Sequence, residues 1–236
     1  MNVTADEKLM YEVMKAFYES GIPISFKGSM VLKLCLAEAG YKEDIRHTAD
    51  IDASWHSDTA PSSDQIKESL QKALDDKNIK LKADVYRMYG ENRSGGFEFR
   101  NICTGELLFT MDIDVNRPLP STKLYEMNGI RFRGSSPVQI IADKVFSISK
   151  DTVFRRIKDI VDLYYISNVF AFDCPEVLRT LDHSGRTLGD FSGFLTRTSD
   201  LQHSYIKFRF SQDITKPDFD TVYRTVREFI KDVLPK

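Results

Sequence analysis

Cysteine is scarce in this chain of 236 residues, and its placement excludes two common kinds of structure. The three cysteines, Cys35, Cys103 and Cys174, lie far apart and are odd in number. Disulfide frameworks and zinc sites instead use sets of cysteines at short, recurring spacings. We therefore expect neither a disulfide framework nor a cysteine-based zinc site, and we predict that the three thiols are buried or idle.

Long apolar runs are missing as well. No segment approaches the roughly 18 consecutive apolar residues of a membrane-spanning helix, and the opening residues MNVTADEK lack the apolar centre of a secretory signal. A large charge of one sign is also absent, because the formal net charge is −2. This argues against bulk attraction to nucleic acid, although the basic clusters at residues 131–133 and 155–158 could contact it locally. We expect a cytoplasmic protein.

The composition is ordinary for a globular protein, with 42% hydrophobic and 29% charged residues. The length predicts one or two domains. The apolar pattern changes near Ser135, because strand-like and helical stretches are mixed before this residue and only helical stretches follow it. We therefore expect a mixed α/β domain in residues 1–135 and a helical domain in residues 136–236.

Periodicity and capping residues predict the individual elements. Thr4 and Glu7 form a capping box that begins the first helix, and Ser136 with Pro137 begins a later one. Strands are expected at residues 24–26, 50–55, 79–88, 96–102, 107–115, 123–126 and 130–133, with turns at 91–95, 103–105 and 127–129. Further helices are expected at residues 29–39, from 62 onwards, and at 137–149, 153–169, 175–182, 190–194, 201–208 and 219–233.

Gly28 and Ser29 lie where a short apolar strand passes into a helix. The first turn of a helix leaves backbone N–H groups without helical partners, and the helix dipole favours anions there. The junction therefore predicts a turn that binds phosphate. A Gly-Ser pair that opens a helix is also common in ordinary loops, so the pair alone does not define a site.

Asp50 and Asp52 alternate with Ile51 and Ala53, as on a strand with one polar face. The two carboxylates would project from one side, about 6.6 Å apart along the backbone, and could bind one divalent ion or straddle two. A solvated strand edge would give the same pattern. The order of strand, Gly-Ser, helix and Asp-x-Asp is more specific, and it predicts a combined phosphate and metal site.

Asp112 and Asp114 are candidates for a further ligand. Two divalent cations held by two carboxylates would leave too much positive charge uncompensated, so such a site needs a third carboxylate. Asp112 and Asp114 share one face of the expected strand 107–115, opposite Met111 and Ile113. Either could be the third ligand, and a strand with one wet face is the alternative.

Lys144 lies within an apolar helical stripe formed by Ile140, Ile141, Val145 and Ile148. A lysine in that position must either extend its amine to solvent or meet an anion. In the second case Lys144 would point into a cleft and neutralise a nucleotide phosphate.

Asp159 on the next helix also has two interpretations. It could form a surface ion pair with Arg155, four residues earlier. It could instead orient Lys144, or take a proton from an acceptor hydroxyl.

These motifs, in this order, resemble those of the AbiEii/AbiGii-type toxin family, within the DNA polymerase β-like nucleotidyltransferase superfamily. The resemblance covers roughly residues 26–164 and rests on FKGS at 26–29, TADID at 48–52, MDIDV at 111–115, ADK at 142–144 and KDIVDLY at 158–164. It implies an α+β fold, in which a nucleotidyltransferase-type mixed β-sheet flanked by helices is followed by a helical domain that completes a cleft. One departure is Lys158, where arginine is usual, because lysine keeps the charge but loses the bidentate fork.

The resemblance also implies roles for particular residues. Asp114 is preferred to Asp112 as the third ligand, because Asp114-Val115-Asn116 matches the family's strand end. The implied catalytic residues are Asp50, Asp52, Asp114, Lys144 and Asp159. The implied nucleotide-binding residues are Lys27, Gly28, Ser29 and Lys144, and the implied metal ligands are Asp50, Asp52 and Asp114.

The implied reaction is transfer of an NMP, or of a phosphoryl group, from an NTP to an acceptor such as tRNA or protein, with Mg²⁺ or Mn²⁺ as the cofactor. Members of the family are typically toxins of bacterial toxin–antitoxin or abortive-infection systems, so a cognate antitoxin is an expected partner. One alternative is a catalytically inactive nucleotide-binding or interaction module on the same fold. Another is an aspartyl-nucleophile phosphatase that uses Asp112, which would need a doubly wound sheet after that strand.

Overall fold

The computed structural model describes residues 4–41, 45–57, 59, 61–88, 93–115, 117–210 and 215–235. The chain forms two compact units. The sheet unit comprises residues 2–35 and 48–136, and the helical unit comprises residue 1 with residues 36–47 and 137–236. Part of the turn expected at 91–95, and Asn116 in the expected strand-end motif, lie outside the described residues.

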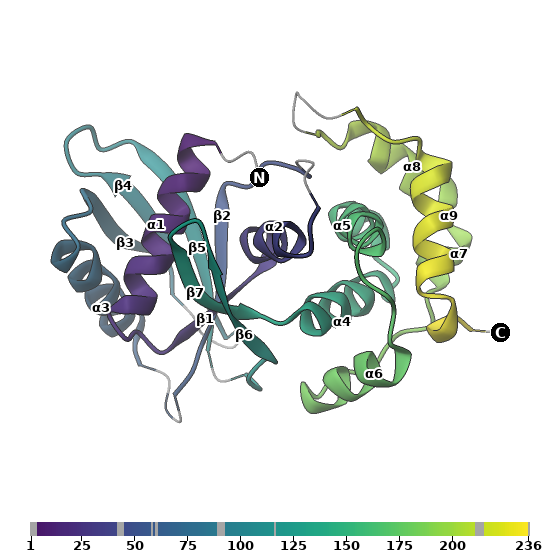
Figure 1. The fold of residues 1–236 in the computed structure, drawn as a ribbon, viewed down its shortest axis with the longest axis horizontal. Coiled ribbons are helices and arrows are strands. Elements are labelled where there is room, and N and C mark those ends of the chain that lie inside the picture. The colour runs from purple at the N-terminus through teal and green to yellow at the C-terminus, as the bar shows by residue number, and fades with distance from the viewer. Residues whose placement is uncertain are drawn as a thin grey trace. The chain divides into compact units, whose positions relative to one another are not determined.

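Within the described residues, the sheet unit is built on a mixed sheet of seven strands in the order β3-β4-β5-β2-β1-β7-β6 (Figure 1). β1 is antiparallel to β2 and parallel to β7, whereas β2 is parallel to β5. The described residues therefore do not form the doubly wound parallel sheet that a phosphatase would need. The strands are β1 (Ile24–Lys27), β2 (Asp50–Trp55), β3 (Leu81–Arg87), β4 (Ser94–Asn101), β5 (Leu107–Asp114), β6 (Thr122–Met127) and β7 (Ile130–Ser135).

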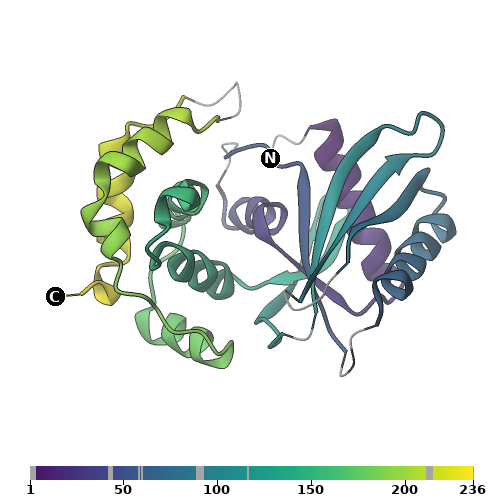
Figure 2. The same ribbon diagram turned by 180° about the vertical axis from the view of Figure 1, so that it is seen from behind.

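Two helices cover one face of this sheet. α1 (Ala5–Glu19) lies in front of the sheet in Figure 1 and behind it in Figure 2, and it touches α3 (Ser63–Asp76), which packs on β3. The capping box predicted at Thr4 is present, and the helix expected from residue 62 has one as well, at Ser62. The apolar residues of the strands face these helices, as shown by the ring of Phe17 on α1, 6.1 Å from that of Phe99 on β4.

The other face of the sheet is polar because the strands alternate. Along β2, Asp50 is exposed and Asp52 half-buried, while Ile51 and Ala53 are buried. Along β5, Thr110, Asp112 and Asp114 alternate with buried apolar residues in the same way. The expectation of one polar face on each of these strands is confirmed.

In the part of the helical unit after residue 136 that the structure describes, there are six α-helices: α4 (Pro137–Ile148), α5 (Ile157–Ser167), α6 (Cys174–His183), α7 (Ser192–Thr196), α8 (Thr198–Lys207) and α9 (Phe219–Phe229). α5 packs against both α4 and α9. The last residues of α2 (Gly28–Glu38) also belong to this unit. No helix among the described residues is both long and apolar enough to cross a membrane.

Two of the predicted helices are shorter than expected. The helix expected at 153–169 begins with a 3-10 turn, Val153–Arg156, and α5 starts only at Ile157. The segment before α5 packs closely on α7, because the backbone at Asp151 and the side chain of Val153 lie against Gly193, where a Cβ would not fit. The helix expected to reach residue 233 ends at Phe229 and is followed by a second 3-10 turn, Lys231–Val233.

Candidate functional site

Gly28 forms the turn between β1 and α2. Its φ is 74°, in the left-handed region that glycine adopts without strain. A Cβ at this position would also overlap the carboxylate of Asp52, which lies directly against the glycine. The first Asp-x-Asp strand and the predicted phosphate turn are therefore in contact, and only glycine permits that contact.

Ser29 makes a hydrogen bond inside the protein. Its Oγ donates to Thr48 Oγ1 at 2.6 Å, and Thr48 Oγ1 donates in turn to Asp50 Oδ1 at 2.7 Å. Ser29 is only 5% exposed. This hydroxyl relay fixes the orientation of the Asp50 carboxylate, so a phosphate at the turn would meet backbone N–H groups rather than the serine hydroxyl.

A buried ion pair between Glu7 and Lys33 holds the backbone of Thr48 in place. Glu7 Oε1 accepts hydrogen bonds from Lys33 Nζ at 2.5 Å and from the backbone N–H of Thr48 at 3.4 Å. The other oxygen of Glu7 accepts from the Thr4 N–H at 3.1 Å. Sequence reasoning gave Glu7 only a capping role and missed Lys33, whose signal was a single cation in the otherwise apolar start of α2.

The acidic residues of β2 and β5 occupy neighbouring positions on the polar face of the sheet. In the register of the sheet, Asp52 lies opposite Lys27 on β1 and beside Asp112 on β5, whereas Asp114 lies beside Ser54. Paired residues on neighbouring strands point to the same side of a sheet. Asp112 is therefore the direct neighbour of Asp52, and Asp114 lies one step further along the strand.

Both carboxylates of β5 are held by donors. Lys27 Nζ donates to Asp114 Oδ2 at 2.5 Å, and Arg117 Nε lies 3.7 Å from the same oxygen. Asp112 Oδ1 accepts from Tyr86 Oη at 2.9 Å and from Arg87 Nη2 at 2.8 Å. In this arrangement, no group of three His, Cys, Asp or Glu side chains among the described residues converges on one point as a set of metal ligands.

The chemistry of the donors nevertheless fits a hard divalent cation. Carboxylate oxygens are the preferred protein ligands of Mg²⁺. The Asp52 carboxylate occupies the space left by the missing Cβ of Gly28, beside the turn predicted to bind phosphate. A cation that used Asp114 Oδ2 as a ligand would compete with Lys27 for that oxygen.

Lys144 and Asp159 belong to the helical unit, where they form a second cluster. Lys144 Nζ donates to Asp159 Oδ1 at 3.1 Å and to Asp162 Oδ2 at 2.6 Å. Lys144 therefore meets anions instead of reaching solvent, and it is only 7% exposed. Of the two interpretations of Asp159, the pairing with Lys144 is observed, and no ion pair between Asp159 and Arg155 is found among the described residues.

Arg46 completes this cluster. Its Nε and Nη2 donate to the two oxygens of Asp162 at 3.1 and 3.3 Å. Burial would raise the pKa of Asp162, but Lys144 and Arg46 outweigh it and lower that pKa to about 2. For Lys144, burial acts to lower the pKa, and the two aspartates reverse this, so the pKa is raised. Lys144 and Asp162 are therefore both charged at neutral pH.

One carboxylate oxygen of this cluster has no hydrogen-bond partner in the described part of the chain. Asp159 Oδ2 is buried and accepts no hydrogen bond from any described residue. A buried carboxylate oxygen left unpaired costs free energy, so its persistence calls for an explanation such as a ligand or a catalytic role. Sequence reasoning singled out Asp159 but missed Arg46 and gave Asp162 no role, although Asp159 and Asp162 share a helix face.

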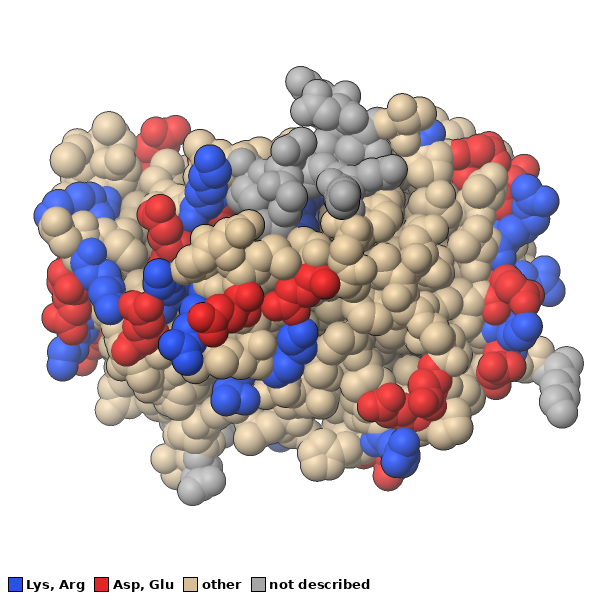
Figure 3. All heavy atoms as spheres, viewed as in Figure 1, with Lys and Arg blue, Asp and Glu red and all other residues tan. Residues whose placement is uncertain are grey.

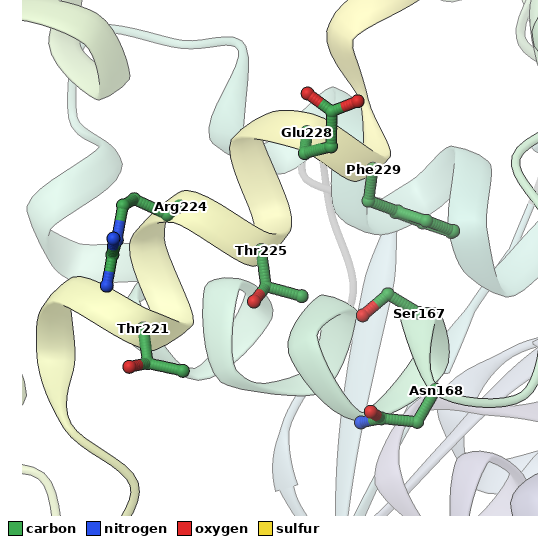
Figure 4. A pocket seen from close by; sticks show the side chains of 7 residues that line it. All are labelled: Ser167, Asn168, Thr221, Arg224, Thr225, Glu228 and Phe229. Carbon is green, nitrogen blue, oxygen red and sulfur yellow. The ribbon is translucent and has the colours of Figure 1, made fainter.

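The surface adds little to these two clusters. On the face drawn in Figure 3, acidic and basic side chains are interspersed, in keeping with the net charge of −2. A cavity of about 480 Å³ lies in the helical unit between α5 and α9 (Figure 4). It is lined by Ser167, Asn168, Thr221, Arg224, Thr225, Glu228 and Phe229, none of which the sequence predicted as a site residue.

Comparison with known proteins places these features in a family. The sequence profile of the nucleotidyl transferase AbiEii toxin family, of type IV toxin–antitoxin systems, matches residues 9–232. Among solved structures, MenT4, a nucleotidyltransferase toxin from Mycobacterium tuberculosis H37Rv, is similar over 97% of this chain and 83% of its own, with 16% identity and a TM-score of 0.57. An antigenic nucleotidyltransferase-like protein from Paracoccidioides brasiliensis is similar over 74% of this chain and 81% of its own, with 15% identity and a TM-score of 0.49.

No curated protein sequence matches the chain. The family match nevertheless covers nearly all of it, and the likeness to MenT4 shows the same α+β fold. The protein therefore belongs to the AbiEii family of toxin nucleotidyltransferases.

Proposed function

We propose that the protein transfers an NMP, or a phosphoryl group, from an NTP to an acceptor in a reaction that requires Mg²⁺, with Mn²⁺ as a substitute. The observation that carries this proposal is the contact between the Asp52 carboxylate and Gly28. It brings a ligand suited to a divalent cation against a helix start suited to phosphate.

The nucleotide tail would bind at the β1–α2 turn. The N–H groups at the start of α2 and the amine of Lys27 would contact the phosphates, and the fixed hydroxyl of Ser29 would hold Thr48 and Asp50 in place. Asp50 and Asp52, with Asp114 or its neighbour Asp112, would hold the metal ions. A bound divalent cation supplies charge neutralisation to the phosphates and lowers the pKa of a coordinated hydroxyl.

The helical unit would contribute Lys144 and Asp159. The proposed role of each residue is based on its contacts within the helical unit. Lys144 is a buried cation that two aspartates keep charged, and a charged amine can offset phosphate charge. Asp159 has an oxygen with no hydrogen-bond donor among the described residues, and that oxygen could accept the proton of an acceptor hydroxyl.

The family supports a proposal for the partners and the location. We propose that a cognate antitoxin restrains the protein, since the family is that of a type IV toxin–antitoxin system. We propose tRNA or a protein as the acceptor, and the bacterial cytoplasm as the place of action.

A binding-only function is the alternative, and one observation favours it. The carboxylates of Asp112 and Asp114 are both held by cationic side chains, and no three acidic or ligating groups among the described residues converge. A protein that bound nucleotide without transferring it could keep this arrangement permanently.

A labelling experiment tests the proposal. The purified protein is incubated with each NTP, labelled at the α- or the γ-phosphate, together with Mg²⁺ or Mn²⁺ and with tRNA, total RNA or cell protein. Transfer of the α-label indicates nucleotidyl transfer, and transfer of the γ-label alone indicates phosphoryl transfer. Asp50→Asn and Asp52→Asn should abolish labelling while the fold persists, and Asp84→Asn on β3 is the matched control. Tight NTP binding by the wild type without labelled product would instead establish the binding-only alternative.

A further inference from the structure

Tyr86 on β3 is the extra residue of a β-bulge. Along the β3–β4 ladder, Val85 lies opposite Phe97 and Arg87 lies opposite Gly96, so Tyr86 has no partner residue on β4. A bulge of this kind re-aims side chains locally, and bulges are frequent next to active sites.

The bulge brings two consecutive side chains to one carboxylate. In a regular strand, Tyr86 and Arg87 would point to opposite faces of the sheet. Here the hydroxyl of Tyr86 and the guanidinium of Arg87 both donate to Asp112 Oδ1, at 2.9 and 2.8 Å. Asp112 is the direct neighbour of Asp52 in the sheet, so the pair stands at the edge of the candidate active site.

Gly96 leaves the space on β4 in which the ring of Tyr86 lies. A Cβ on Gly96 would overlap the ring atoms of Tyr86, so the ring lies directly on the backbone of β4. The residue is still 47% exposed, and the Arg87 side chain is also 47% exposed. The hydroxyl fixes the ring at one end, and part of its surface remains open to a ligand.

The in-line geometry of phosphoryl transfer indicates which reactant would meet Tyr86 and Arg87. The attacking and leaving oxygens lie on opposite sides of the phosphorus. The sheet row runs from Lys27, next to the Gly28 turn, through Asp52 and Asp112 to Gly96. If the leaving phosphates bind at Gly28, the acceptor approaches from the other end of the row, where Tyr86 and Arg87 lie.

We propose that Tyr86 and Arg87 form the acceptor subsite, and that its occupant is an unpaired nucleotide of an RNA strand, whose base stacks on Tyr86 and whose phosphate pairs with Arg87. The inference rests on the proposed function, because it uses the position of the leaving phosphates. An exposed aromatic face beside an exposed guanidinium is the combination with which proteins bind single-stranded nucleic acid. The bulge at Tyr86, the contact of its ring with Gly96 and the two hydrogen bonds to Asp112 Oδ1 fix the positions of the Tyr86 ring and the Arg87 guanidinium.

Direct binding tests the subsite without requiring turnover. A fluorescein-labelled single-stranded RNA of mixed sequence is titrated with the full-length protein, and its anisotropy is followed at several salt concentrations. Base stacking on an aromatic side chain has a known range of strengths, so Tyr86→Ala should weaken the Kd by about 5- to 100-fold. Tyr86→Phe keeps the ring and loses only the bond to Asp112, so its Kd should stay within about twofold of wild type.

Arg87→Ala should weaken binding and reduce the salt dependence of log Kd by about one ion, as expected for one lost phosphate contact. Arg100→Ala is the matched control. Arg100 on β4 pairs with Glu98 at 2.8 Å, as Arg87 on β3 pairs with Asp112, but Arg100 lies outside the row. Its removal should leave Kd and salt slope unchanged. Melting temperatures of all variants, followed by circular dichroism, verify folding.

The outcomes separate this inference from the proposed function. If Tyr86→Ala binds RNA as the wild type does, or if the transferase reaction labels only protein, the subsite is wrong even though the transferase stands. If RNA binding depends on Tyr86 but no label leaves any NTP, the subsite stands as an RNA-binding surface and the proposed reaction fails. Loss of binding in Tyr86→Phe equal to that in Tyr86→Ala would also overturn the stacking assignment.

Discussion

Lys33 Nζ lies 2.5 Å from Glu7 Oε1, and the two side chains are 2% and 0% exposed. The pair joins α1 to α2 inside the sheet unit, and Glu7 also accepts the backbone N–H of Thr48, just before β2. It therefore ties together the three segments around the Gly28 turn without contributing an atom to the polar face of the sheet.

Removing one member of this pair should be costly. Lys33→Met leaves a buried carboxylate without its cation, which typically costs about 3–5 kcal/mol of unfolding free energy. Replacing both partners, as Glu7→Gln with Lys33→Met, should recover a substantial part of that loss because no charge is left buried. Urea denaturation measures both values. Lys15→Met is the control, since the amine of Lys15 is solvent-accessible and lies 3.9 Å from Glu19. Equal stability of Lys33→Met and Lys15→Met would show that the pair contributes nothing.

Thr48 should influence activity more than stability. Thr48→Val keeps the shape but removes the hydroxyl that accepts from Ser29 and donates to Asp50. Because Asp50 is exposed, its carboxylate can take water as a substitute, and the expected effect is a loss of orientation. We expect kcat for NMP transfer to fall about 10- to 100-fold, in line with small misplacements of catalytic groups. Thr48→Ser should restore most of the rate. Unchanged kcat in Thr48→Val would exclude the relay.

The local alternation of polar and apolar residues predicted both limits of the strand that carries Asp50 and Asp52. The expected limits 50–55 are those of β2, because polar and apolar residues alternate through Asp50, Ile51, Asp52 and Ala53 and this alternation depends on the strand alone. The capping box at Thr4 was likewise predicted, because Thr4 bonds a residue only three positions later.

The features that could not be predicted from the sequence depend on contacts between residues that are distant in the chain. Arg46 was missed, because nothing near it in the sequence indicates that its carboxylate partner lies 116 residues later. The bulge at Tyr86 depends on its register against Gly96 across the ladder, and on the space that this glycine leaves. Neither relationship is visible as a period or a motif in one sequence.

Lys27 should have opposite effects on metal and nucleotide binding. Its amine pairs with Asp114, so Lys27→Met removes a positive charge that competes with a divalent cation. One charge at this range is worth on the order of 1 kcal/mol in a partly solvated site. We therefore expect Mn²⁺ to bind severalfold more tightly in the absence of nucleotide. The NTP should bind more weakly, since the variant loses a phosphate contact.

Mn²⁺ binding can be measured by electron paramagnetic resonance, and NTP binding by calorimetry. Lys82→Met is the control, because Lys82 pairs with Asp84 at 2.7 Å on β3, outside the row of carboxylates. A change of the same sign for metal and nucleotide in Lys27→Met would contradict the assignment of Lys27 to both.

Asp162 should make the stability of the protein sensitive to acid. Lys144 and Arg46 overcome the effect of burial and lower its pKa from 3.8 to about 2. A carboxyl with a lower pKa in the folded than in the unfolded state binds its proton mainly after unfolding, so it stabilises the fold above the unfolded pKa. That contribution, roughly 2 kcal/mol by linkage, is present above about pH 4 and is lost as the pH falls towards 2. Urea denaturation of the wild type from pH 7 to pH 2 should show the loss in this window. Asp162→Asn should be less stable at pH 7, because Lys144 and Arg46 lose a carboxylate, and its stability should fall less steeply below pH 4. Parallel curves for the two proteins would mean that Asp162 is not the titrating group.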